Sequence, residues 1–256
     1  NIEIISYSTH LIISLPINDL ISEYTQDIYT DQNGLDWNKG TAFAVREDGW
    51  LITANHVLQD TNQGFLLEFD ENNSEIRTPI VDIIFNSDWD FAIVKVDKNL
   101  SAVNLIIDET KIKPGMSVGF MGFPRNEITL FTHEGVISRV LSLENGLPPT
   151  YNIHAFVNSG QSGGPVFIKE TGEVIGFISA RAKASNLPQK ELIDPSIAEN
   201  DLIRLILELK RGQDEIYNIL SKELGKTSQM GIGIIVGMNQ PTLNDFIYKF
   251  ENQNIN

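Results

Sequence analysis

Short apolar runs separated by turn residues fill the chain from residue 40 to about residue 180. Each run has the length of a strand, and regularly spaced short strands are typical of an all-β sandwich or barrel. Pairs such as Pro114-Gly115, Asn145-Gly146 and Thr171-Gly172 stand between runs as turn signals. The pattern predicts strands at 41–46, 50–54, 65–69, 76–85, 91–96, 117–123, 128–140, 151–157, 165–168 and 174–180.

The two ends of the chain follow a different pattern. Apolar residues at helical spacing predict a short helix over 16–28 and a longer one over 197–224, which begins after Asp194-Pro195. Residues 182–230 therefore interrupt the strands with a helical segment. Strand character returns at 231–237, and 242–251 is predicted to be a closing helix.

One serine stands among glycines in the stretch 158–167, whose sequence is NSGQSGGPVF. Gly160, Gly163 and Gly164 allow the backbone to turn tightly and to present its N–H groups. A hydroxyl held beside fixed N–H donors suits attack on an acyl carbon, because those donors stabilise the charge that develops on oxygen. Ser162 is therefore the candidate nucleophile, although this stretch alone also fits an ordinary glycine-rich turn.

A base and an acid are available upstream of this serine. The segment LITANHV carries His56 from a strand into a turn, and DWDFAIV places Asp90 immediately before an apolar strand. Taken singly, each residue also has a purely structural explanation. Their order excludes other hydrolases: in α/β-hydrolases the histidine follows the serine, whereas all four histidines here precede Ser162. A subtilisin-type site needs an acid before the histidine, and only loop acids such as Asp36 lie suitably there.

The segments TANH, DFAIV and GQSGGP together resemble the trypsin-like (chymotrypsin-fold) serine peptidases, and most closely the bacterial HtrA/Deg-type protease domain. GTAFAV at 40–45, KPGMSVGFMGFP at 113–124, THEGVIS at 132–138 and GIGI at 231–234 extend the resemblance. It covers roughly residues 39–180 and 231–250.

The resemblance implies an all-β fold of two packed antiparallel six-stranded β-barrels, with an inserted helical segment and a C-terminal helix. Residues 1–38 would form an N-terminal extension, followed by a protease domain at 39–256. The first barrel, 39–110, would carry His56 and Asp90. The second, 111–256, would carry Ser162 and the helical insertion at about 182–230.

The implied activity is serine endopeptidase chemistry through an acyl-enzyme, without metal or cofactor. Ser162 would attack the peptide carbonyl, His56 would transfer the proton, and Asp90 would orient the imidazole. The backbone N–H groups of Gly160 and Ser162 would form the oxyanion hole. A non-catalytic trypsin-fold scaffold is the alternative from another class, but such proteins usually lack a triad member. A viral polyprotein protease is disfavoured, since the usual specificity histidine is absent from 177–180.

The same matching places the substrate-binding residues. Phe156, six residues before the nucleophile, would floor the S1 pocket and favour aliphatic side chains over Lys or Arg. Ser179, Ala180 and Arg181 match the strand that binds substrate backbone and forms the pocket wall. Arg181 would either be solvated, which we prefer, or select an acidic side chain.

Gln161 departs from the digestive enzymes, in which an Asp at this position pairs with a newly freed N-terminal amine. We therefore expect no activation through that ion pair. In the family's fold the insertion at 182–230 borders S1, so it would either pack on the second barrel, gate the cleft, or dock a regulatory partner or further domain. Its helix at 197–224 is a candidate for holding the oxyanion loop.

Composition narrows the partners. With 34 acidic residues against 19 Lys plus Arg, the formal charge of −15 argues against nucleic acid and anionic membranes. No apolar run reaches the length of a membrane span, and the absence of cysteine excludes disulfides and thiol chemistry. Four scattered histidines argue against a metal site, which leaves a polypeptide substrate as the expected partner. The lack of a signal-peptide pattern and of cysteine favours the cytoplasm, but the chain does not begin with Met, so the compartment stays open.

Overall fold

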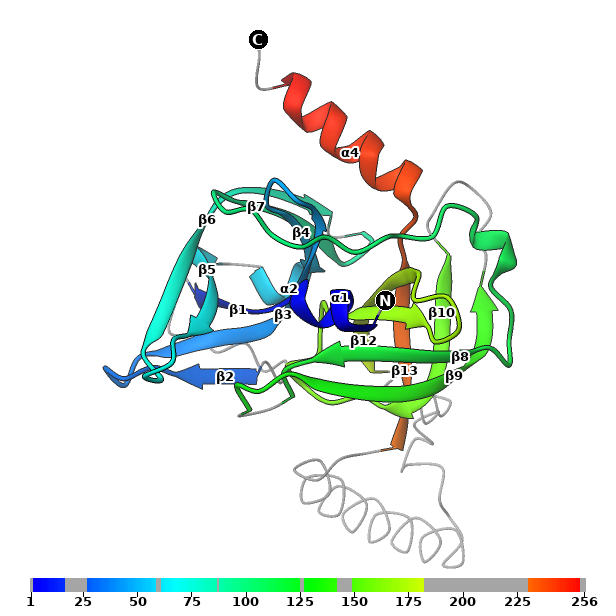
Figure 1. Cartoon of the computed structure of the whole chain (residues 1–256), viewed down its shortest axis with the longest axis horizontal. Helices are drawn as coiled ribbons and strands as arrows, with labels where there is room; N and C mark the ends of the chain where they lie inside the picture. The colour runs from blue at the N-terminus through cyan, green and yellow to red at the C-terminus, as the bar shows by residue number, and fades with distance from the viewer. Residues whose placement is uncertain are drawn as a thin grey trace, which may run out of the picture.

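The computed structural model describes residues 2–16, 27–58, 61–86, 88–124, 127–141, 149–181 and 230–253. The helix expected over 197–224 lies outside these residues, as does most of the one expected over 16–28, which is wrong at its end because Asp27–Thr30 is a strand. Strands dominate the described part (Figure 1). The elements are α1 (Ile2–Tyr7), β1 (Thr9–Pro16), β2 (Asp27–Thr30), β3 (Asp36–Arg46), β4 (Trp50–Ala54), α2 (Asn55–Leu58), β5 (Thr61–Phe69), β6 (Glu75–Asn86), β7 (Phe91–Val96), the 3-10 turn η1 (Glu109–Lys111), β8 (Ser117–Gly122), β9 (Phe131–Leu141), β10 (Thr150–Phe156), β11 (Pro165–Ile168), β12 (Val174–Arg181), β13 (Met230–Gly237) and α4 (Gln240–Gln253).

These strands form two antiparallel barrels that lie side by side in Figure 1. The first has the order β1-β5-β6-β7-β4-β3 and closes where β1 pairs with β3, while β2 lengthens the sheet beyond β3. The second is the closed barrel β10-β13-β12-β11-β8-β9. The structure thus confirms the predicted fold of two six-stranded barrels with a C-terminal helix.

The N-terminal part of the chain corrects the expected boundary of the first barrel. Strand β1 pairs with β3 on one side and with β5 on the other, so it closes the barrel instead of preceding it. Leu11, Ile12 and Ile13 are almost fully buried there. The first barrel therefore begins near Thr9, and residues 1–38 are not simply an extension.

Buried and half-buried strands can be told apart by their sequence pattern. Strand β4 (WLITA) is buried at every position and β7 (FAIVKV) at all but one, which explains their nearly continuous apolar runs. Strand β10 instead alternates buried with more exposed residues, as a strand with one solvated face does. The apolar core of the first barrel continues across the barrel contact to residues of β8, β11, β12 and β13, and the interior of the second barrel forms a separate cluster.

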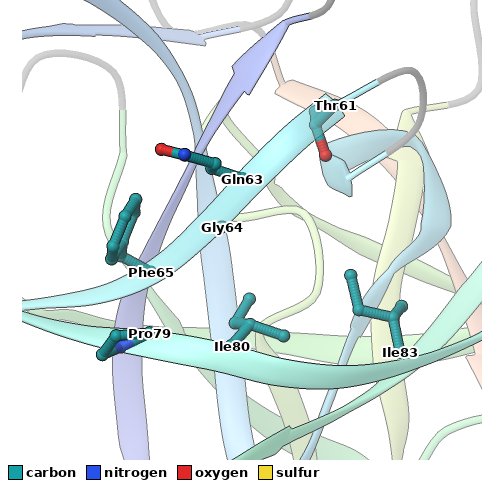
Figure 2. Close-up of a pocket in the computed structure, with 7 residues that line it drawn as sticks. All are labelled: Thr61, Gln63, Gly64, Phe65, Pro79, Ile80 and Ile83. Carbon is teal, nitrogen blue, oxygen red and sulfur yellow. The ribbon is translucent and has the colours of Figure 1, made fainter.

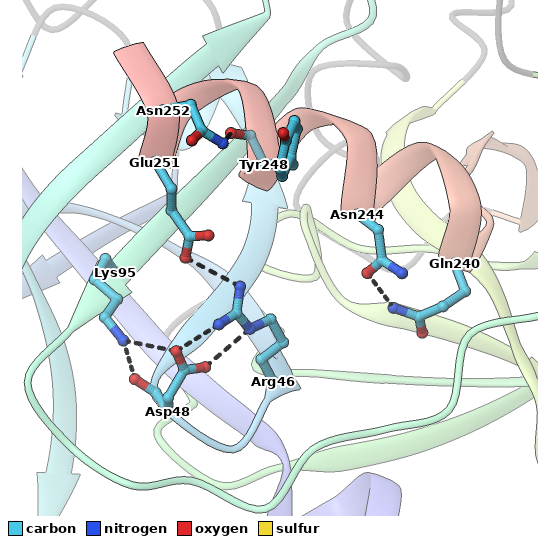
Figure 3. Close-up of polar contacts among 8 residues, drawn as sticks. All are labelled: Arg46, Asp48, Lys95, Gln240, Asn244, Tyr248, Glu251 and Asn252. Atoms are coloured by element: carbon cyan, nitrogen blue, oxygen red, sulfur yellow. Dashed lines mark hydrogen bonds and ion pairs between the residues drawn. The ribbon is translucent and has the colours of Figure 1, made fainter. Parts of the chain in front are cut away.

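The closing helix α4 packs across the first barrel after leaving β13 of the second. Leu243 and Ile247 are buried there, and the Phe246 ring meets the Trp89 ring edge to face at 5.6 Å. Figure 3 shows the polar end of this contact, where Arg46 Nη1 donates to Glu251 of α4 at 3.2 Å. Helix α4 therefore connects the second barrel to the first barrel beside Trp89, the residue that directly precedes Asp90. None of the helices in the described residues is long and apolar enough to cross a membrane.

Candidate active site

The short helix α2, which follows β4 and carries His56, meets the turn before β7 that carries Asp90. The backbone N–H of Asn55 donates to Asp90 O at 3.0 Å, and the N–H of His56 donates to Asp90 Oδ1 at 3.1 Å. Asp90 has a φ of 50°, a left-handed conformation that Asp tolerates better than most residues. These backbone hydrogen bonds thus hold the Asp90 carboxylate beside the His56 imidazole independently of the contact between the two side chains.

The side chains complete the pair. His56 Nδ1 lies 3.0 Å from Asp90 Oδ1 and 2.9 Å from Oδ2. A carboxylate only accepts hydrogen bonds, so Nδ1 carries the hydrogen and a neutral imidazole keeps its lone pair on Nε2. The two side chains are 36% and 29% exposed, which leaves the pair open toward the solvent side.

Ser179 of the second barrel reaches across to the same carboxylate. Its hydroxyl donates to Asp90 Oδ2 at 2.5 Å. The pairing of β12 with β13 shifts register between Ile178 and Ala180, so Ser179 stands at an irregularity of the ladder. The sequence placed Ser179 in the substrate-binding wall, which stays a prediction, and gave no signal for this contact of its side chain with the acid.

The loop around Ser162 holds some of its backbone N–H groups in internal hydrogen bonds and not others. Gln161 N donates to Asn158 O, Gly163 N to Ile178 O, and Gly164 N to Gln161 O. No acceptor among the described residues takes the N–H of Gly160 or of Ser162. Gly160 and Gly163 both have φ values of 84°, which favour glycine. The free donors are the two that the sequence predicted for the oxyanion hole.

This loop lies against the strands that carry the histidine. Thr41 N donates to Ser162 O at 2.8 Å, which joins β3 of the first barrel to the nucleophile candidate. A Cβ on Gly163 would clash with Thr41 O and Thr53 Oγ1 and would lie 2.8 Å from Ala54 N. Because Ala54 ends β4 just before His56, the packing places Ser162 beside the His56 turn.

Gln161 is fully buried and uncharged. Its Oε1 accepts a hydrogen bond from Asn158 N at 2.7 Å, within its own loop. The candidate helix at 197–224 lies outside the described residues. Within the described part, hydrogen bonds from Asn158 and Thr41 hold the loop that an ion pair holds in the digestive enzymes.

Comparison with known proteins agrees with this geometry. The profile of the family described as "Trypsin-like peptidase domain" matches residues 40–177, which is more than half of the chain. The chain belongs to the trypsin-like peptidase family. The matched span runs from the residue before Thr41 through Ser162 to strand β12.

Relatives of this trypsin-like chain include HtrA-type proteins. It is 33% identical over 146 residues to a "Probable periplasmic serine endoprotease DegP-like" of Pseudomonas putida, covering 55% of this chain and 28% of that protein. It is 28% identical over 214 residues to "Serine protease HTRA1A" of Danio rerio, covering 80% of this chain and 40% of that protein. The solved structure "HtrA-type protease AlgW with tripeptide" matches with a TM-score of 0.57 at 17% identity, over 91% of this chain and 57% of that one. This last likeness concerns the fold.

The residues predicted for the S1 pocket of this trypsin-like chain are only partly described. Phe156 ends β10 opposite Met230 and is 46% exposed. Ala180 and Arg181 pair with Ile234 and Gly233 in the sheet, but their side chains lie outside the described set. The assignment of the pocket floor and wall therefore stays a prediction.

A cavity of about 250 Å³ lies elsewhere, where β5 and β6 diverge in the first barrel (Figure 2). Phe65, Pro79, Ile80 and Ile83 give it an apolar lining that contains none of the three triad candidates. The described residues also contain no cluster of His, Asp and Glu able to hold a metal ion. Neither feature adds to the site around Ser162.

Proposed function

We propose that this chain is a serine endopeptidase that hydrolyses peptide bonds through His56, Asp90 and Ser162. One observation carries the proposal: an Asp-paired histidine stands beside a serine loop in which no acceptor among the described residues takes the N–H groups of Gly160 and of Ser162 itself. The family membership and the HtrA-type relatives support the same chemistry. A trypsin-fold scaffold has no need of these paired features.

The proposed reaction follows from the roles that the geometry allows. Ser162 Oγ attacks the peptide carbonyl while His56 Nε2 takes its proton, and the Gly160 and Ser162 N–H groups stabilise the oxyanion. His56 then gives the proton to the leaving amine, which leaves an acyl-enzyme on Ser162. Water then attacks this ester while His56 takes its proton, and His56 returns the proton to Ser162 Oγ as the acid product leaves. Asp90 keeps the Nδ1 hydrogen in place throughout.

The proposed substrate is a polypeptide. A solved relative is described as binding a tripeptide, and a half-exposed Phe156 in place of a carboxylate disfavours Lys and Arg at S1. The matched region spans only 28% of the length of the first curated relative. That this chain acts on the same class of substrate as such a longer protein is therefore proposed. We also propose that residues 182–230 bind a regulatory partner, because the insertion borders S1 in the family's fold.

Substitution of the nucleophile tests the proposal. Ser162→Ala is expected to keep the fold and to lower kcat on the order of 10⁶-fold, because the nucleophile and base act as one unit. A fluorophosphonate probe should label the wild-type protein at Ser162 and leave the variant unlabelled. Ser138→Ala, which removes an exposed hydroxyl on β9, is the matched control and should keep both activity and labelling. Undiminished turnover by Ser162→Ala, or a wild-type protein that neither cleaves peptides nor takes the probe, would refute the assignment.

A further inference from the structure

Thr41 joins the first barrel to the serine loop through two hydrogen bonds. It lies fully buried on β3 of the first barrel. Its N–H donates to Ser162 O at 2.8 Å, and its hydroxyl donates to Gly160 O, also at 2.8 Å. Thr41 therefore binds the carbonyls of both residues whose N–H groups are left free.

The direction of the hydroxyl is set by a second bond. Phe123 N donates to Thr41 Oγ1 at 3.2 Å, so the hydroxyl's own hydrogen is left for Gly160 O. The chain Phe123 N–H, Thr41 O–H, Gly160 C=O runs one way, and successive hydrogen bonds in such a chain strengthen each other. The Thr41 carbonyl in turn accepts from Thr53 Oγ1 at 2.7 Å, which fixes the threonine on its own sheet.

Gly160 needs such an anchor. It has no side chain and a φ of 84°, so both peptides that flank it rotate more easily than those of other residues. The Gln161 N–H is held by Asn158 O, but at a longer 3.3 Å. The shorter bond from Thr41 to Gly160 O therefore does most to fix this peptide.

We propose that the Thr41 hydroxyl is a positioning group of the oxyanion hole. By fixing the Gly160–Gln161 peptide, which lies between the peptides that carry the Gly160 and Ser162 N–H groups, it keeps both N–H groups facing the reacting carbonyl. The inference rests on the proposed function, because it assigns Thr41 to the same site. Thr41 touches no substrate atom; it acts through the loop. GTAFAV resembles a family motif in sequence alone. Its hydrogen bonds to the carbonyls of Gly160 and Ser162 indicate a positioning role for Thr41.

Two substitutions separate the hydroxyl from the rest of the side chain. Thr41→Val replaces the hydroxyl by a methyl group of similar size, and Thr41→Ser keeps the hydroxyl. Thr41→Val should lower kcat by about 10- to 100-fold and leave KM within about twofold. A misplaced oxyanion donor lowers kcat by at most about as much as a deleted one. Thr41→Ser should stay within about threefold of the wild-type protein.

Thr9→Val is the matched control. Thr9 is also buried on the first barrel, and its hydroxyl also donates to a backbone carbonyl, that of Ile5 at 2.6 Å. It makes no contact with the oxyanion loop in the pairings of β1. Its loss should reduce stability, by less than the loss at Thr41 because the Thr41 hydroxyl makes two hydrogen bonds, and should leave kcat unchanged.

A peptide boronic acid gives a second readout. Its tetrahedral adduct places an oxygen where the oxyanion develops, so its inhibition constant should rise in Thr41→Val in proportion to the loss of kcat. If Thr41→Val does not fold, Thr41→Ser and Thr41→Ala replace the pair, since these two differ by the hydroxyl alone.

Each outcome decides one way. A kcat for Thr41→Val within twofold of wild type, an equal loss in Thr41→Ser, or an equal loss in Thr9→Val overturns the role of the hydroxyl. These results leave the proposed function standing when Ser162→Ala is inactive in the same assay. Activity in Ser162→Ala would instead remove the proposed function first.

Discussion

The two halves of the site differ in how the opposite barrel holds them. His56 and Asp90 belong to the first barrel, and Ser179 of the second barrel donates to the Asp90 carboxylate. Ser162 and its loop belong to the second barrel, and Thr41 of the first donates to the loop at two points. Each barrel thus anchors the reactive group of the other, so the geometry of the site depends on how the barrels dock.

The anchors are not equivalent. The Asp90 side chain is 29% exposed, so water can replace a lost donor there. Thr41 is fully buried, and the backbones of the two barrels are in close contact at Gly163. A buried polar group that loses its partner pays the full cost of desolvation. The nucleophile half should therefore tolerate change less well than the acid–base half.

Gly163→Ala breaks the docking most directly and should have the largest effect. The new Cβ would clash with Thr41 O and Thr53 Oγ1, which forces the loop away from β3 and β4. We expect kcat/KM to fall at least about 100-fold from misplacement of the nucleophile. Peptide hydrolysis and urea unfolding of the purified variant measure the two consequences.

Gly115→Ala is the control for this substitution. Gly115 has a similar φ of 91° but has no atom within 4 Å of the Cβ position. It should cost about 1 kcal/mol of stability from backbone strain alone, with no loss of activity. Equal kinetic losses in the two glycine variants would mean that strain, and not docking, controls the site.

Ser179→Ala tests the other half and should have a smaller effect. Asp90 loses one donor but keeps the His56 N–H and the imidazole, so kcat/KM should fall about tenfold, as for a partly solvated bond to a charged group. Combining it with Thr41→Val in a double-mutant cycle asks whether the two anchors act independently. If the anchors act separately, the fold loss of kcat/KM in the double variant should equal the product of the two single losses within about twofold. A double variant no less active than Thr41→Val would contradict separate anchors.

The sequence pattern predicted the strands, because strand runs are short-range signals, whereas the two barrels and the candidate triad were predicted from the resemblance of local motifs to a known family. The closure of the first barrel by β1 was missed, since its short apolar run has no local feature that identifies its distant partners β3 and β5. Ser179 was predicted on the pocket-wall strand, but its bond to Asp90 was not predicted, because it occurs at a register shift in the β12–β13 ladder that has no local sequence signal. The contact between Thr41 and Gly160 joins residues 119 positions apart and has no local signature.

Acidification should reveal whether the barrels unfold together, and its effect should be the smallest. His10 on β1 is buried, and burial lowers its pKa from 6.5 to about 4, while Glu68 nearby opposes the shift. Between those values the unfolded chain binds a proton that the folded one does not, so this stability is complete above about pH 6.5 and is lost as the pH falls toward 4. From pH 7 to 5.5 the loss from His10 should be about 1 kcal/mol. His10→Gln should remove this loss and leave only the contribution of half-buried His133, whose pKa is also lowered by burial, whereas the control His154→Gln, whose histidine is exposed, should retain it in full.

All three tryptophans lie in the first barrel, so their fluorescence follows that barrel, while hydrogen exchange of the β11 amides follows the second. Barrels that anchor each other should lose the same stability in both probes, because they unfold as one unit. A pH-dependent shift in the tryptophan transition alone would show that the first barrel unfolds separately. The reciprocal anchors at Thr41 and Ser179 would then orient the site without coupling the stability of the two barrels.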